Sequence, residues 1–153
     1  MSFFKATYLK TIRPQKQNTF DVSDKHGLAL LTRLRVDFSD LRDHRFRHKW
    51  NCANPTCRCN IENETTDHFF LRCPIFNGHR KALLSALSDI LKIDEVLLTS
   101  LPAATFVDML LYGSKEYNIT TNRLILEASI RYMLATSRFK TIEAYQDHIA
   151  YII

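Results

Sequence analysis

Four cysteines and one histidine are the residues of this 153-residue sequence best suited to chemistry. Cys52, Cys57, Cys59 and Cys73 fall within 22 residues, and His68 lies between the last two. In intracellular compartments thiols are kept reduced, so a cluster of this kind points to a metal site before it points to disulfides. Thiolate and imidazole groups are the donors that Zn²⁺ prefers in structural sites.

The best ligand set is Cys57, Cys59, His68 and Cys73, with the spacing C-x-C-x8-H-x4-C. Three thiolates and one imidazole fill a tetrahedral zinc site and leave no open position, so the spacing predicts one structural Zn²⁺ rather than a catalytic ion. The alternative is a set of reduced core thiols with a histidine at the surface. Cys52 could replace Cys57 or Cys59 as a ligand, or it could be a small buried thiol outside the site.

The elements around the cluster must bring these donors to one point. Residues two apart on an extended segment face the same side, so Cys57 and Cys59 could both face one ion. His68 and Cys73 are five residues apart and would diverge by about 140° on an unbroken helix. Pro74 disfavours helical backbone at Cys73, so the short helix that begins near Thr65 should end there and let Cys73 turn back toward His68.

The rest of the chain favours helices. Three glycines and four prolines are few for a many-turned β-protein. The apolar patterns predict helices near 28–38, 40–49, 75–91, 102–112, 121–138 and 141–152, the first capped by Ser23. The expected fold is mainly α, a small helical domain with an irregular Cys-Cys-His-Cys zinc-knuckle insert. We divide it into an N-terminal segment and linker (1–24), a basic helical region (25–92) with the knuckle at about 51–74, and a C-terminal helical region (93–153).

Charge is distributed unevenly along the chain. Residues 1–80 carry 14 basic and 8 acidic side chains, a net charge of +6, whereas residues 81–153 carry 7 and 8, a net charge of −1. This asymmetry suggests a polyanionic partner, and RNA or DNA bound without sequence specificity is the leading candidate. The candidate contacts combine cations with an aromatic ring and are Arg33, Arg35, Arg42, Arg45, Arg47, Lys49 and Trp50.

A second interpretation of the same basic segment needs no partner. In it, Phe46 and Trp50 belong to the core, and the arginines are solvated or paired with Asp37, Asp40 and Asp43. The sequence does not choose between the two interpretations. It carries no apolar run long enough to span a bilayer and no secretory signal, so we expect an intracellular protein, nuclear or cytoplasmic, without a membrane or small-molecule partner.

Several motifs around the cluster resemble those of one known family. They are LTRLR at Leu31 to Arg35, SDLRDHRF at Ser39 to Phe46, P-x-C-x-C at Pro55 to Cys59, and ET-x-x-HFFL-x-CP at Glu64 to Pro74, followed by Arg80. Together they look like the C-terminal zinc-knuckle region of reverse transcriptases encoded by non-LTR (LINE-like) retrotransposons. The stretch from Asn122 to Lys140 also resembles the C-terminal tails of some of these proteins.

The resemblance implies a zinc knuckle at Cys57, Cys59, His68 and Cys73 that helps to hold template RNA or target DNA beside the polymerase. It also implies that the chain is a fragment and not an enzyme, because the Tyr-x-Asp-Asp run of the polymerase palm is missing. Two other functions remain open. One is a zinc-stabilised interaction module that docks onto a polymerase core. The other is a metal-dependent nuclease around Asp43, His44 and His48, although no pair of carboxylates with supporting ligands accompanies them.

Overall fold

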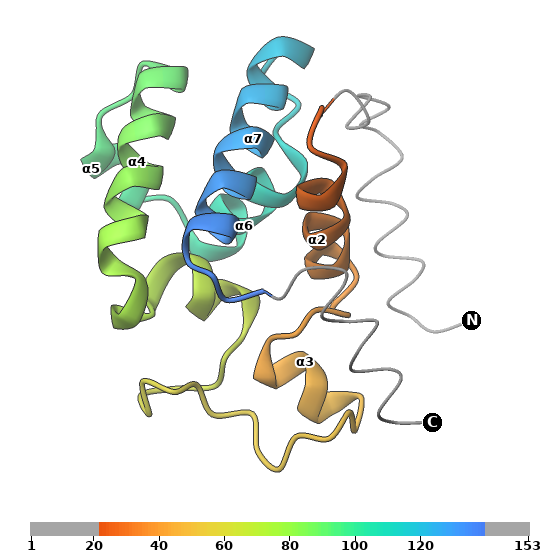
Figure 1. Ribbon diagram of the computed structural model, residues 1–153. Helices are drawn as coiled ribbons and strands as arrows, with labels where there is room; N and C mark the ends of the chain where they lie inside the picture. Colours follow the sequence, from red (N-terminus) through yellow and green to blue (C-terminus); the bar gives the residue numbers. More distant parts are fainter. Residues whose placement is uncertain (1–21, 140–153) are drawn as a thin grey trace.

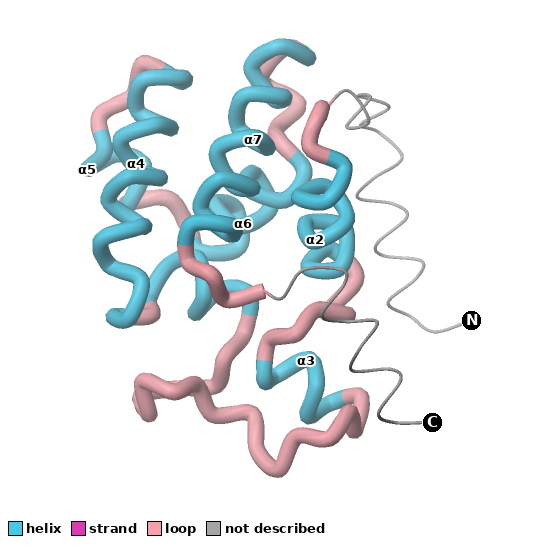
Figure 2. The backbone as a smooth tube through the Cα atoms, viewed as in Figure 1, coloured by secondary structure: helices cyan, strands magenta, loops and turns pink. Residues whose placement is uncertain are grey.

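The computed structural model describes residues 22–139, and this part of the chain is built from helices and loops, with no strand (Figure 2). The regular α-helices are α2 (Lys25–Arg35), α3 (Arg42–Arg47), α4 (Asn77–Leu91), α5 (Glu95–Thr99), α6 (Ala103–Tyr112) and α7 (Ile119–Ala135). A π-helical turn, η2 (His68–Arg72), and a 3₁₀ turn, η3 (Pro74–Phe76), precede α4. The mainly helical fold class is therefore confirmed.

Helix α7 lies at the centre of the fold and packs against α4, α6 and α2 (Figure 1). Its buried residues include Ile125, Leu126, Ile130 and Met133, which meet apolar side chains from all three neighbours. Gly27 on α2 allows the closest approach, because a Cβ atom there would lie 2.2 Å from Cγ2 of Ile130. A helix buried on several sides in this way supplies most of the apolar contact that stabilises a small domain.

The helix ends follow local chemistry that the sequence largely predicted. Pro102 precedes α6 and Gly113 ends it, with Gly113 in the left-handed region at φ 77°. Helix α2 is capped by Asp24 and not by Ser23, since the Asp24 carboxylate accepts the Gly27 N–H at 2.8 Å. Helix α7 begins two residues earlier than predicted, because Asn118 caps it by accepting the Thr121 N–H at 2.8 Å.

Helix α3 and the loop from residue 48 to residue 65 lie at one end of the helical bundle (Figure 1). The 40–49 and 75–91 predictions correspond to α3 and α4, while α5 was not predicted. The predicted helix at 141–152 and most of the N-terminal segment 1–24 lie outside the described residues. The boundary near residue 92 stays a prediction.

Membrane-spanning character was tested for the same part of the chain. Between residues 22 and 139, every helix is too short or too polar to cross a bilayer.

Candidate metal centre

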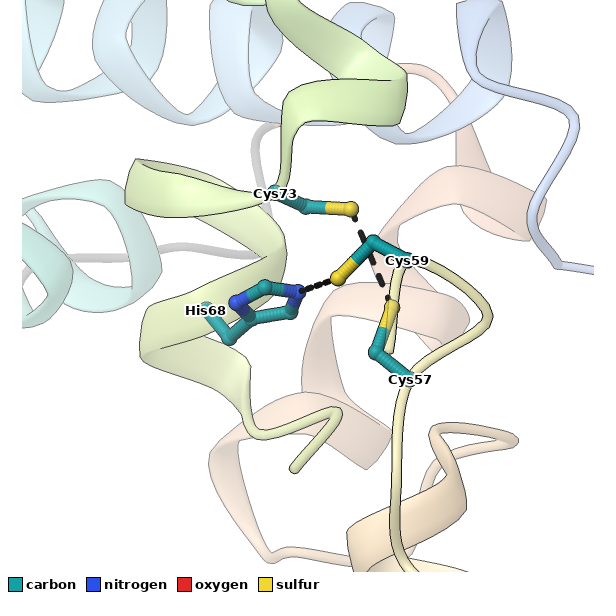
Figure 3. A group of neighbouring side chains, drawn as sticks. All are labelled: Cys57, Cys59, His68 and Cys73. Atoms are coloured by element: carbon teal, nitrogen blue, oxygen red, sulfur yellow. Dashed lines mark hydrogen bonds between the residues drawn. The ribbon is translucent and has the colours of Figure 1, made fainter. Parts of the chain in front are cut away.

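Four donor atoms meet at one point in the loop region. One ligand atom each from Cys57, Cys59, His68 and Cys73 lies within 4.8 Å of all the others (Figure 3). The Sγ atoms of Cys57 and Cys73 are 3.8 Å apart, and Sγ of Cys59 lies 3.3 Å from Nε2 of His68. Cys57, His68 and Cys73 are buried, and Cys59 is partly buried. All four cysteines are free thiols.

The spacing of these donors fits a tetrahedral zinc ion. With Zn–S bonds of about 2.3 Å, two sulfurs of a regular tetrahedron stand about 3.8 Å apart, and a sulfur and an imidazole nitrogen about 3.6 Å apart. The Cys57–Cys73 distance equals the first value, and the Cys59–His68 distance is slightly shorter than the second. The cluster could therefore hold one metal ion such as zinc.

A tight turn positions Cys57 and Cys59. The Asn60 N–H donates to the Cys57 carbonyl at 2.9 Å, and Asn60 adopts a left-handed conformation at φ 61°. Around the turn, Thr56 and Asn63 form an isolated antiparallel bridge. The extended segment that we expected between the two cysteines is therefore wrong. The turn brings both thiols to one side because its ends are held together by backbone hydrogen bonds.

The other two donors are positioned by the π-helical turn. The Cys73 N–H donates to the His68 carbonyl at 2.8 Å, an i→i+5 hydrogen bond. In such a turn a residue lies above the residue five positions earlier, so the five-residue spacing stacks Cys73 on His68. Cys73 itself has extended backbone (φ −62°, ψ 119°) before Pro74, which confirms the predicted helix end.

Two polar side chains support this turn from either end. The Thr65 hydroxyl accepts the His68 N–H at 3.1 Å, so Thr65 is the cap expected at the start. At the far end, Arg80 on α4 donates to the carbonyls of Phe70 and Cys73 at 2.9 and 2.7 Å. The Cys73 carbonyl also accepts the Phe76 N–H at 3.2 Å, so Arg80 joins the end of this turn to the 3₁₀ turn that follows. Arg80 was noticed in the sequence only through the family resemblance, without a physical role.

Glu62 orients the imidazole of His68. Its Oε1 lies 2.9 Å from Nδ1 of His68, a close polar contact without the alignment of a good hydrogen bond. This leaves Nε2 to face the thiols, an arrangement common among zinc-bound histidines. Burial opposes ionisation of Glu62, but the Arg72 guanidinium, 2.8 Å away, more than compensates and lowers the pKa of that carboxyl. Sequence reasoning missed Glu62, because the turn alone brings it back to His68.

Cys52 stands apart from the other three cysteines. Its Sγ lies 3.0 Å from the Asn54 carbonyl oxygen and 3.7 Å from that of Arg42, outside the donor group. Its side chain is only partly buried. The structure therefore places Cys52 beside the site as an additional thiol, and not as a replacement for Cys57 or Cys59.

The predicted nucleic-acid contacts fall into two groups in space. Arg45 and Arg47 face acidic partners: Arg45 lies 3.7 Å from Asp40, and Arg47 lies 2.9 Å from Asp43. Lys49 and Trp50 follow α3 and are exposed, and Arg42 at its start is partly exposed. The acidic pairing that the second interpretation expected is confirmed for Arg45 and Arg47, but its placement of Phe46 and Trp50 in the core is wrong, because both rings are exposed.

The remaining two predicted contacts lie in the last turn of α2. Arg35 packs against α6, where its Nε donates to the Leu111 carbonyl at 2.6 Å and its guanidinium lies 5.1 Å from the centre of the Tyr112 ring. Arg33 is partly exposed. A role of these seven residues in binding nucleic acid stays a prediction.

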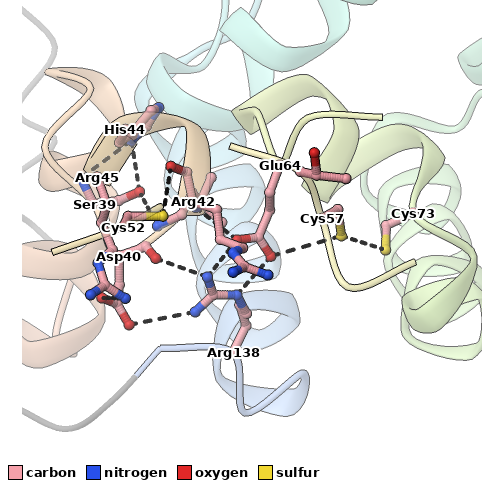
Figure 4. A network of polar contacts seen from close by, with 12 residues as sticks. Ser39, Asp40, Arg42, His44, Arg45, Cys52, Cys57, Glu64, Cys73 and Arg138 are labelled. Atoms are coloured by element: carbon pink, nitrogen blue, oxygen red, sulfur yellow. Dashed lines mark hydrogen bonds and ion pairs between the residues drawn. The ribbon is translucent and has the colours of Figure 1, made fainter. Parts of the chain in front are cut away.

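Glu64 joins the metal centre to distant parts of the fold (Figure 4). One carboxylate oxygen lies 4.0 Å from Sγ of Cys57, and the other accepts the Arg42 N–H at 2.8 Å. The same carboxylate accepts from Nε of Arg138 at 2.8 Å, and Arg138 also donates to the Asp40 carbonyl at 2.8 Å. Glu64 and Arg138 are 74 residues apart, so no local pattern in the sequence pairs them.

Comparisons of the chain with models of known protein families, with curated proteins and with solved structures give no match. The fold and the site therefore define the class of protein directly. It is a small helical domain with a Cys-Cys-His-Cys cluster that could bind one metal ion such as zinc.

Proposed function

We propose that this chain is a zinc-stabilised nucleic-acid-binding accessory module, without polymerase or endonuclease chemistry of its own. The observation that carries the proposal is the meeting of three thiols and one imidazole within 4.8 Å, contributed by a tight turn and by the π-turn that follows it in the chain. The resemblance of this segment to the zinc knuckle of non-LTR reverse transcriptases supports RNA or DNA as the partner.

The role of zinc in this proposal is structural. Three thiolates and Zn²⁺ together carry a net charge of −1, so the centre itself does not attract phosphate. The ion would instead fix the loop between α3 and α4. The surplus of cations needed for phosphate contacts then comes from α3 and its flanks, where residues 33–50 carry six basic and three acidic side chains.

Metal content tests the first half of the proposal. Mass spectrometry under native conditions should find one zinc ion per chain in the wild type, and His68→Ala should lose or weaken it. Order should then be lost in residues 51–74, while the C-terminal helices persist by circular dichroism. Cys52→Ser is the matched control and should keep the ion, since Cys52 lies outside the donor group. A wild-type chain that folds equally well without metal would refute the structural role of zinc.

A salt series tests the second half. Binding to single-stranded RNA and DNA should weaken as salt rises, with a linear dependence of log affinity on log salt that reports the phosphates neutralised. A slope near zero would remove nucleic acid as the partner, whatever the outcome for zinc.

A second candidate function is docking onto a polymerase core. It is favoured by the exposed apolar side chains at α5, where Val96, Leu97 and Leu101 are 71%, 59% and 38% exposed. Exposed apolar residues that are grouped in this way are typical of protein interaction sites. If the isolated chain aggregates and a polymerase fragment keeps it in solution, docking is favoured. A stable monomer that binds RNA strongly would favour the nucleic-acid module.

A further inference from the structure

Three aromatic rings meet beside α3 and remain open to solvent. The ring centres of Phe38 and His48 are 4.1 Å apart, those of Phe38 and Trp50 are 4.8 Å apart, and those of His48 and Trp50 are 4.9 Å apart. Phe38 is 47% exposed and Trp50 is 40% exposed. We refer to these three residues as the aromatic cluster. These large rings pack on one another, yet much of their surface remains in contact with water. Exposed apolar clusters of this kind are typical of binding sites.

Backbone hydrogen bonds hold the aromatic cluster in place. The Trp50 N–H donates to the Arg45 carbonyl at 2.8 Å, and the Arg45 guanidinium donates to the carbonyls of Trp50 and Asn51 at 3.3 and 3.2 Å. On the other side, Nε2 of His48 lies 3.0 Å from the Asp37 carbonyl oxygen. The chain on either side of the rings is therefore fixed independently of any contact made by their exposed faces.

This local structure includes three residues in a conformation that side chains other than glycine rarely adopt. Asp37, Lys49 and Asn51 have φ values of 57°, 59° and 49°, and each is the immediate neighbour of a member of the aromatic cluster. Left-handed residues of this kind are unfavourable and tend to gather where a particular side-chain placement is needed. Here they direct the aromatic rings of two separate segments onto one another.

Cations lie beside the aromatic cluster. Lys49 lies between His48 and Trp50 in sequence and is exposed. Arg47 is also exposed, but it lies 2.9 Å from Asp43 and 3.9 Å from Asp37, so its charge is shared with two carboxylates. The Phe38 N–H donates to the Arg33 carbonyl at 2.9 Å, which places the ring at the basic end of α2. Aromatic faces beside cations are the combination by which proteins bind single strands: bases stack on the rings and phosphates lie against the cations. A neutral apolar segment of a partner protein would use the rings but would gain little from the cations.

We infer that the aromatic cluster of Phe38, His48 and Trp50 is a stacking site for unpaired bases of a single nucleic-acid strand. This inference rests on the proposed function and makes it more specific, because it assigns the base contact to named rings and excludes duplexes, whose bases are already stacked. Relative to the sequence prediction, it adds Phe38 and His48 to Trp50. Phe46, the other aromatic residue of α3, is 43% exposed but makes no ring contact with the cluster among the described residues.

Trp50 is the only tryptophan of the chain, so its fluorescence reports on this site alone. We would titrate zinc-loaded protein with oligouridine, with oligodeoxythymidine and with an abasic strand of the same length and charge. The strands that carry bases should quench the emission, and the abasic strand should not. They should also bind more tightly than the abasic strand at equal salt.

Substitutions separate the rings from the cations. Phe38→Ala and Trp50→Ala should each weaken binding of the base-bearing strands by about 5- to 150-fold, the range found for loss of one stacked base, and should leave binding of the abasic strand unchanged. Because Trp50→Ala has no tryptophan, the affinities of the variants are measured by the anisotropy of dye-labelled strands. The matched control is Phe46→Ala, which removes an equally exposed ring outside the cluster and should leave both affinities unchanged. Unchanged zinc content and helical signal would show that the variants still fold.

The outcomes distinguish this inference from the proposed function. If all strands bind equally and the emission does not change, the cations bind phosphate but the rings do not stack, and only the inference fails. If no strand binds even at low salt, the proposed function fails with it. If acrylamide does not quench Trp50 in the free protein, another part of the chain covers the rings, which also overturns the inference.

Discussion

The three thiols of the metal centre differ in how readily each loses its proton. Burial raises the pKa of Cys57 from 9.0 to about 12, and burial likewise raises the pKa of Cys73. Burial would also raise the pKa of Cys59, but hydrogen bonds from the Ile61 and Glu62 N–H groups and from the neighbouring thiols outweigh it and lower that pKa. Cys59 is therefore the thiol best prepared to meet an incoming metal ion as a thiolate.

Metal affinity should depend steeply on pH. At neutral pH the thiols of Cys57 and Cys73 are protonated in the metal-free chain, and an ion must displace both protons to bind them. Each displaced proton makes the apparent affinity rise about tenfold per pH unit, so the protons of Cys57 and Cys73 alone should give a rise of at least about 100-fold per unit between about pH 6 and pH 8. Competition with a chromophoric chelator measures it. A pH-independent affinity would mean that the thiols are already ionised.

At the scale of single residues, the sequence predicted the four metal-binding side chains but not the residues around them. Cys57, Cys59, His68 and Cys73 could be selected because zinc needs four thiolate or imidazole donors and these four are close together in the chain. The role of Glu62 and the grouping of Phe38 and His48 with Trp50 could not be predicted, because both depend on turns closed by non-glycine residues in left-handed conformations. The sequence does not show which polar residues adopt that conformation.

The π-turn η2 is the element that makes the five-residue spacing of His68 and Cys73 workable. On a regular α-helix these residues would point to different sides. The predicted helix end at Pro74 explains only part of their approach. The wider turn closes the remaining angle. Tyr132 of α7 supports it, since its buried hydroxyl donates to the Phe69 carbonyl at 2.5 Å, and burial raises the pKa of that hydroxyl to about 12.

Arg80→Ala should disturb this turn. The change removes the side-chain hydrogen bonds to the Phe70 and Cys73 carbonyls, leaving the Cys73 carbonyl only the Phe76 N–H, and should lower the free energy of unfolding by about 1–3 kcal/mol. It should also weaken zinc binding, because Cys73 loses the contact that fixes its backbone. Chemical denaturation and chelator competition measure the two effects. His79→Ala, an exposed neighbour, is the control and should change neither. Weaker stability with unchanged zinc affinity would contradict the positioning role.

Most helices could be predicted because their ends carry strong local signals. Pro102 and Gly113 delimit α6, and Pro74 separates η2 from α4. Helix α5 has only five residues, too few for a periodic apolar pattern to appear, and its start depends on Asp94 accepting the Val96 N–H. A π-turn has no recognised composition, so η2 could be predicted only as a helix of unspecified type.

On the scale of the whole domain, the Glu64–Arg138 pair joins the metal loop to the segment that follows α7. Burial disfavours the charge of Arg138, but its hydrogen bonds to Glu64 and Asp40 outweigh this and raise the pKa of the guanidinium. Glu64 is 3% exposed, so its carboxylate depends on this partner. The Glu64–Arg138 pair therefore couples the stability of the metal-binding loop to the stability of the helical bundle.

Arg138→Ala should be strongly destabilising. It leaves the Glu64 carboxylate buried without a counter-ion, a change that costs roughly 3–5 kcal/mol in comparable sites. Urea unfolding should show the loss, and Arg131→Ala, an exposed position on α7, should shift stability by less than about 0.5 kcal/mol. The double variant Arg138→Ala/Glu64→Gln should lose less unfolding free energy than the sum of the losses in the two single variants. Additive effects would show that the side chains act independently.

The central position of α7 has a consequence for the order of events during protein synthesis. The ribosome releases a chain from its N-terminal end, so Cys57 to Cys73 emerge before Ile119–Ala135. Until α7 appears, α2, α4 and α6 lack the helix that all three pack against. A nascent chain could thus bind its metal ion before α7 is synthesised. The loop that carries the four donors would then already be folded when α7 packs against the other helices.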